Sequence, residues 1–64
     1  MNRQNALALT VARVQAAELR LTQATTIIEA NALKTFMVEE AIVGAKSNLA
    51  FLKGYFGAEL EKEV

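Results

Sequence analysis

The side chains of this chain that could take part in chemistry are glutamates, lysines and arginines, with one serine and one tyrosine. There is no His and no Cys. Their absence removes the usual general base, the thiolate nucleophile and the imidazole or thiolate ligands of metal sites. Ser47 has no base near it in the sequence, and we interpret it as a helix cap or a surface residue. The sequence therefore predicts no catalytic residue and no enzyme.

The glutamates also lack the spacing of a metal or cofactor site. Glu39 and Glu40 are adjacent and so point to different sides of a helix. Carboxylate-bridged metal sites in helical bundles use Glu-x-x-His, and the His is missing. Glu59, Glu61 and Glu63 alternate near the end of the chain and are most simply a solvated tail. With no glycine-rich phosphate loop either, we expect no metal and no cofactor.

The basic residues are few for nucleic-acid binding. Seven Lys and Arg balance seven Asp and Glu, so the net charge is zero. Arg13 and Arg20 are seven residues apart and share a helix face, whereas Arg3 lies off that face. Phosphate-driven binding typically uses about 6–10 contacts, so nucleic acid is not the expected partner. A small RNA-binding bundle that uses these three arginines is the alternative function.

No segment is expected to span a membrane or to act as a signal peptide. The longest uncharged run, Gln4 to Ala12, is nine residues, whereas a membrane-spanning helix needs about 20. Arg13 and Arg20 interrupt any apolar core of a signal peptide. We expect a cytoplasmic protein. Its size and simplicity suggest that a phage or another mobile element encodes it, in which case we expect it in the host cytoplasm or the virion.

The length of 64 residues allows one domain at most. A chain this short buries only about 60% of its unfolded surface when it folds alone. Such small scaffolds are usually stabilised by disulfides, a metal or oligomerisation, and the composition removes the first two. The expected partners are therefore a second copy of the chain, as a homodimer or a higher oligomer, and another protein.

Strong helix formers dominate the chain, which has no Pro and no Gly before Gly44. Apolar residues recur at alternating steps of three and four, which predicts a helical seam. We assign as the oligomer seam its large members, Leu7, Val14, Leu21, Ile28, Val38, Ile42, Leu49, Leu52 and Phe56. Asn31 and Thr35 interrupt the seam at its middle. Either the chain turns there or one long helix buries a polar pair.

A second pattern favours the turn. Small residues recur four apart in each half of the chain, at Ala8, Ala12, Ala16, Ala50, Gly54 and Ala58. When the chain is folded antiparallel about residue 33, the first three lie opposite the last three, with Ala12 opposite Gly54. Small residues in such rows let two helices approach closely. We therefore predict that these six residues form a close-packing ridge between two helices.

The predicted fold is all-α, an antiparallel helical hairpin in which Asn2 and Thr35 cap the two helices. The expected single domain, 1–64, comprises a helix at about 3–30, a turn at about 31–35, a helix at about 36–58 and an acidic tail at 59–64. The first helix carries two separate apolar stripes, but a hairpin gives it only one neighbour. We therefore expect two hairpins to assemble into a dimeric four-helix bundle. Three short helices, or one long coiled-coil helix, are the alternatives.

Three of the four aromatic residues fall in the stretch Asn48-Leu49-Ala50-Phe51-Leu52-Lys53-Gly54-Tyr55-Phe56-Gly57. Phe56 belongs to the seam, while Phe51 and Tyr55 lie at its margin. These two are either part of a bundle core or an exposed contact for another protein, because aromatic residues are enriched at interface centres.

Scattered residues resemble the small plasmid-encoded repressor-of-primer family, namely Met1, Gln4, Ala8, Leu9, Ala12, Arg13, Phe56 and Gly57. The resemblance implies a dimeric four-helix bundle that binds paired RNA loops. The chain departs from the family at Val14, Glu18 and Thr25, where the family has an aromatic residue, a glutamine and a lysine. The residues for RNA recognition are therefore not carried over. We expect instead a non-enzymatic helical protein–protein interaction module that acts as a small regulator, inhibitor, adaptor or structural subunit.

Overall fold

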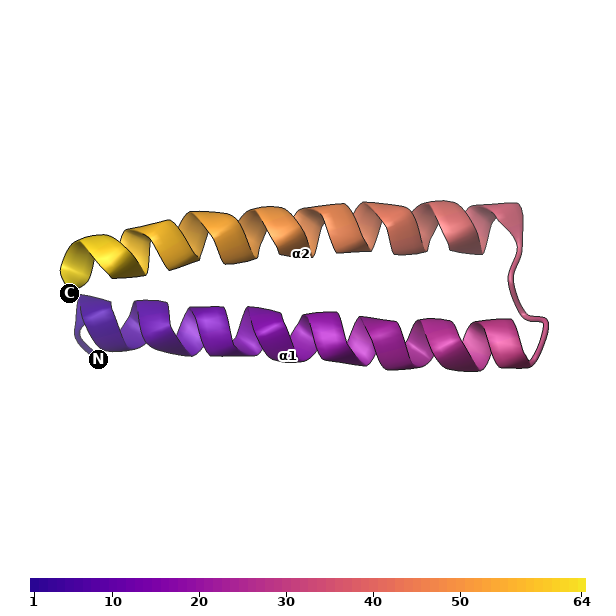
Figure 1. The fold of residues 1–64 in the computed structure, drawn as a ribbon, viewed down its shortest axis with the longest axis horizontal. Helices are drawn as coiled ribbons and strands as arrows, with labels where there is room; N and C mark the ends of the chain where they lie inside the picture. The colour runs from indigo at the N-terminus through magenta and orange to yellow at the C-terminus, as the bar shows by residue number, and fades with distance from the viewer.

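The computed structural model describes residues 1–64 as two long helices joined by a short turn (Figure 1). Helix α1 spans Arg3–Ala30 and helix α2 spans Phe36–Glu63, each of 28 residues. The helices run antiparallel, so both termini lie at the end opposite the turn (Figure 1). The predicted all-α hairpin is confirmed, and the alternatives of three short helices and of one long helix are wrong.

Both helices begin at the side-chain caps that the sequence predicts. The Asn2 side chain accepts a hydrogen bond from the Asn5 backbone N–H at 2.7 Å. The Thr35 hydroxyl oxygen accepts one from the Val38 backbone N–H at 3.2 Å. Each cap occupies one of the backbone donors that the first turn of a helix leaves without a partner. The two helix starts are therefore fixed locally, without help from the rest of the fold.

The turn is closed by backbone hydrogen bonds and by one strained residue. The Leu33 N–H donates to the Ile28 carbonyl at 2.9 Å, and the Ala32 N–H donates to the Glu29 carbonyl at 3.4 Å. This pairing is the Schellman arrangement, which needs a left-handed residue just after the helix. Ala32 takes that conformation, with φ of 54°. Asn31 precedes it as the C-cap, so this polar residue ends α1 and is not buried in a seam.

Helix α2 is longer than the sequence predicts. The expected helix end near residue 58 and the expected acidic tail at 59–64 are wrong, because α2 continues to Glu63. Gly57 costs helical stability of up to about 1 kcal/mol but does not end the helix. The residues that follow it are mostly strong helix formers, and two of them make ion pairs with α1, as described below.

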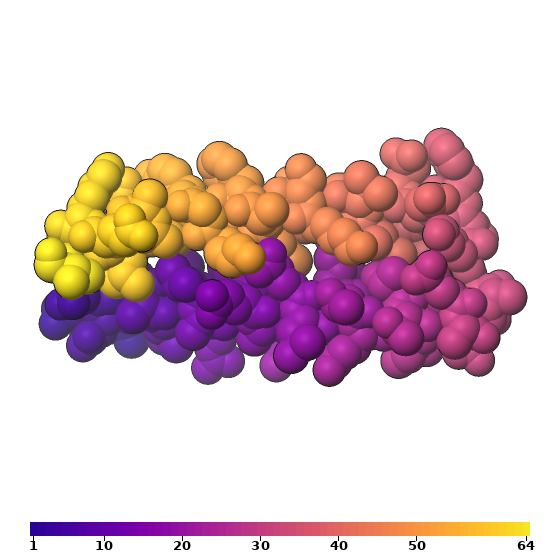
Figure 2. All heavy atoms as spheres, in the orientation of Figure 1, coloured from indigo at the N-terminus to yellow at the C-terminus, as the bar shows by residue number.

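The hairpin has a single helix–helix interface and a very small core. Only Leu7 and Val14 are buried, at 6% and 9% exposure. Figure 2 shows the two helices side by side as one layer, in contact at intervals along their length. The molecule measures 45 × 16 × 15 Å. The Cα radius of gyration is 14.6 Å, whereas a compact domain of this length has about 11 Å. The fold thus leaves most of each helix surface exposed.

The strain at Ala32 gives a stability prediction. We expect Ala32→Gly to stabilise the hairpin by about 1 kcal/mol, because glycine adopts the left-handed conformation without the clash of a Cβ. The matched control is Ala30→Gly, two residues earlier in the last turn of α1, which should destabilise by up to about 1 kcal/mol. Thermal unfolding followed by circular dichroism measures both. A fall in the melting temperature of Ala32→Gly would contradict the turn geometry.

Candidate interaction surfaces

The predicted seam forms the contact between α1 and α2. Besides the buried Leu7 and Val14, all of its other members are half-buried: Leu21, Ile28, Val38, Ile42, Leu49, Leu52 and Phe56. The seam therefore packs the two helices of one chain against each other. Because it has no third helix to cover it, most of these side chains keep part of their surface in water.

The predicted close-packing ridge does not lie between the helices. Five of its residues are exposed, and only Ala16 is half-buried. A Cβ added at Gly54 would meet no atom within 4 Å, so the predicted pairing of Gly54 with Ala12 is wrong. At about 100° per residue, the ridge positions lie roughly 120–180° around each helix from the seam. The larger seam residues bury more apolar area on contact, and they set which faces meet.

One side of the hairpin, which we call the charged face, carries ion pairs between or near the helices. Lys53 Nζ on α2 lies 3.1 Å from Glu18 Oε1 on α1. Near the turn, Lys34 Nζ lies 3.9 Å from a carboxylate oxygen of Glu29 and 3.9 Å from one of Glu39. These side chains are partly exposed, so each pair contributes only about 0.2–1 kcal/mol.

Two shallow grooves lie on the charged face. The larger, of about 260 Å³, is lined by Glu18, Leu21, Thr22, Lys46 and Leu49. The smaller, of about 150 Å³, lies nearer the turn and also includes Lys46. Both are below the roughly 300–1,000 Å³ typical of small-molecule sites, and each mixes acidic and basic side chains. They show no specialised ligand site.

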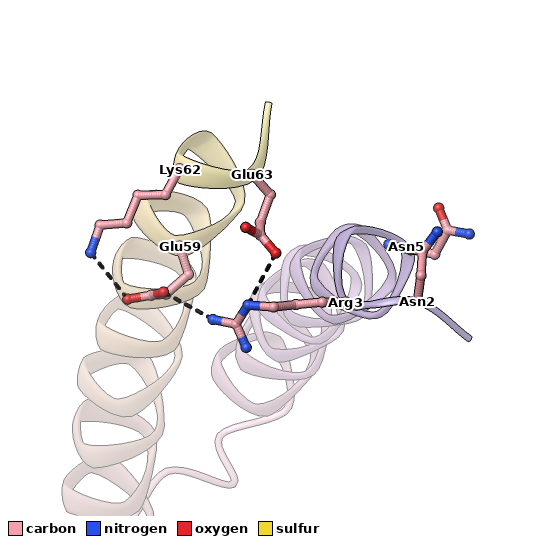
Figure 3. A network of polar contacts seen from close by, with 6 residues as sticks. All are labelled: Asn2, Arg3, Asn5, Glu59, Lys62 and Glu63. Carbon is pink, nitrogen blue, oxygen red and sulfur yellow. Dashed lines mark hydrogen bonds and ion pairs between the residues drawn. The ribbon is translucent and has the colours of Figure 1, made fainter.

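Arg3 links the two helices at the end of the hairpin where the termini lie (Figure 3). Its Nη2 lies 3.1 Å from Glu59 Oε2, and its Nε lies 3.1 Å from Glu63 Oε1. Lys62 adds a contact of 3.4 Å to the other Glu59 oxygen. The prediction of an acidic tail at 59–64 left no role for Glu59 and Glu63 in such a site. A signal existed, since Glu59 and Glu63 are four apart and share a helix face.

The side opposite the charged face, which we call the open face, carries ion pairs only at its terminal end, where Arg3, Glu59 and Lys62 meet. The helical periodicity of 100° per residue places six exposed residues there: Ala24, Ile27, Met37, Ala41, Asn48 and Tyr55. Arg13 and Arg20 lie on its α1 side and form no ion pair within the chain, unlike Arg3. The open face carries no acidic residue among these positions, and its large apolar side chains are uncovered.

The aromatic residues at the seam margin are exposed. Phe51 and Tyr55 are 68% and 52% exposed. Their rings stack on each other, with centroids 6.0 Å apart and an interplanar angle of 21°. Tyr55 also meets Phe56 edge to face at 5.1 Å. Within one hairpin the pair is therefore a surface feature, anchored on the seam through Phe56.

The structure brings no three His, Cys, Asp or Glu side chains together as metal ligands. Neither helix combines the length and the apolar character that crossing a membrane requires.

The exposure of Gly54 gives a second prediction. We expect Gly54→Leu to stabilise the protein by about 0.8 kcal/mol, because leucine is the better helix former and meets open space. As a control, Ala45→Leu at a half-buried seam position should destabilise by about 1–3 kcal/mol through overpacking. Chemical denaturation measures both free energies of unfolding. Destabilisation by Gly54→Leu would show that another helix packs against this residue.

The aromatic pair gives a third prediction. We expect Phe51→Ala to change the free energy of unfolding by no more than about 0.5 kcal/mol, as at other exposed sites. Phe56→Ala should cost about 2 kcal/mol or more, because it opens a gap in the seam. The comparison uses thermal melts at equal protein concentration. Equal losses from the two substitutions would place Phe51 in a core.

No family model, curated protein or solved structure matches this chain. The likeness to the repressor-of-primer family therefore stays a resemblance of scattered residues.

Proposed function

We propose that this chain is a non-enzymatic helical interaction module that completes its hydrophobic core by associating with other helices. The observation that carries the proposal is the size of the core, in which only Leu7 and Val14 are buried. Chains of this size rarely gain enough stability from one core, and without disulfides or a metal they depend on association. A single layer of two helices buries one stripe per helix and leaves the others in water.

The first partner that we propose is a second copy, giving a dimeric four-helix bundle. The apolar side chains of Ile27 on α1 and Met37 on α2 support this, because both stay exposed. In a hairpin these residues have no neighbour. A bundle of two hairpins gives each helix two neighbours and is a closed, symmetric assembly.

A further proposed contact is with another protein, through Phe51 and the Tyr55 ring stacked on it. Exposed aromatic side chains of low conformational entropy are typical anchors at interface centres. In this role the chain is a small regulator, inhibitor, adaptor or structural subunit. A cytoplasmic location and an origin in a phage or another mobile element are part of the same proposal.

RNA binding is the second candidate function, and one observation favours it. Arg13 and Arg20 lie on one side of α1 without an acidic partner, so they are free to contact phosphates. Arg3, however, is held by Glu59 and Glu63. A salt series separates the two functions. RNA binding weakens steeply as salt rises, because phosphate contacts release counterions, whereas an apolar protein interface changes little.

Self-association gives a fourth prediction. We expect sedimentation equilibrium to show a dimer at micromolar concentration, and the melting temperature to rise with protein concentration, because dimerisation stabilises only the folded state. A monomer with a sharp melt that is independent of concentration would reject the interaction-module proposal.

Contact with another protein is tested by affinity capture from the native host with the wild-type chain as bait. The control bait is Phe51→Ala, which should keep the fold and the oligomeric state. A protein retained by the wild type and lost with Phe51→Ala supports the aromatic contact. Retention of the same protein by both baits would exclude it.

A further inference from the structure

We infer that the second copy docks on the open face, and that the dimer interface is formed neither by the charged face nor by the outer ridge, which is the row of small residues Ala8, Ala12, Ala16, Ala50, Gly54 and Ala58. The inference rests on the proposed function, because it names the surface through which that self-association takes place. Three observations support it: the surface area that the lone hairpin leaves exposed, the distribution of charge between the two faces, and the sizes of the side chains on the open face.

The surface area that the hairpin exposes in excess of a compact protein matches the area that one additional hairpin would cover. The chain exposes 4838 Å², whereas a compact globular protein of 7.0 kDa exposes about 4,000 Å². The excess of about 800 Å² equals the share that one partner buries in an interface of standard size. The layer measures 45 × 16 × 15 Å, so the partner that covers one broad face must itself be about 45 Å long and two helices wide. A second hairpin has these dimensions.

The distribution of charge selects the face. Docking on the charged face would take the Glu18–Lys53 pair and the pairs of Lys34 out of water, and desolvating ion pairs commonly costs more than their attraction returns. Along its middle and near the turn the open face offers two arginines and no acidic residue, and its ion pairs are confined to Arg3, Glu59 and Lys62 at the terminal end. Arginine carries its charge on a long apolar stem, so Arg13 and Arg20 can pack their stems and keep their charged groups in solvent at the rim.

The side chains of the open face suit the close approach of a second layer. Ala24 on α1 and Ala41 on α2 lie at nearly the same height along the antiparallel hairpin and on the same side of the seam. Small residues at such a position let another helix come near. The larger Ile27 and Met37 lie toward the turn, while Tyr55 lies toward the termini at the edge of this face, stacked on the exposed Phe51. The net charge of zero adds no repulsion between copies.

The test places the same substitution on two faces of α1. Ala24 and Ala12 are both exposed alanines within the helix, but Ala24 lies on the open face and Ala12 on the outer ridge. We expect Ala24→Glu to weaken the dimer by at least about 100-fold, since a carboxylate at this position must lose its hydration in the apolar part of the interface. Ala12→Glu should leave the dimer intact. Sedimentation equilibrium measures both dissociation constants, and circular dichroism confirms helicity.

A second open-face variant, Ala41→Glu on α2, protects the test against a folding defect that is specific to Ala24→Glu. Loss of the dimer in either open-face variant that remains helical, with Ala12→Glu dimeric, supports the inference. A dimer that survives both open-face variants, or that only Ala12→Glu dissociates, overturns the assigned face while self-association stands. A wild-type chain that is monomeric and melts sharply at every concentration overturns the inference together with the proposed function.

Discussion

The contact between α1 and α2 along one seam is the interaction on which the rest of the structure depends. It is the only interface between the two helices, and it buries just two residues, Leu7 and Val14. Long helices are needed because each turn adds little burial, and 28 residues per helix give the seam its length. The caps, the turn and the Arg3 ion pairs align the helices, but each supplies at most about 1–2 kcal/mol.

The hairpin itself was predictable because its signals are local or periodic. The seam follows from steps of three and four residues, and Asn2 and Thr35 are caps by residue type and position. The turn was placed at Asn31 even though no Gly or Pro marks it. The structure explains how the chain manages without them, since Ala32 accepts the left-handed conformation that the Schellman hydrogen bonds require.

The two errors arose because residue spacing alone does not determine which face of a helix meets its neighbour, or which residues distant in the sequence form a contact. Rows of alanine and glycine four apart allow a close contact but do not draw helices together, so Gly54 ended on the outside while bulkier residues met. The acidic residues after Gly57 read as a tail because Arg3, their partner, is distant in sequence. The open face falls between these cases, because its residues are set by periodicity, while the confinement of its ion pairs to the terminal end emerges only from the folded chain.

The position of the termini has a consequence for how this chain can be joined to others. Met1 and Val64 leave the hairpin at one end, beside the Arg3–Glu63 ion pair, while the turn occupies the far end (Figure 1). Proteins whose termini lie close together tolerate circular permutation. A short linker could join the end of α2 to the start of α1, and the chain could be opened between residues 31 and 35. The permuted hairpin would keep the same seam. A protein domain fused to either terminus would lie at the same end of the hairpin, about 45 Å from the turn.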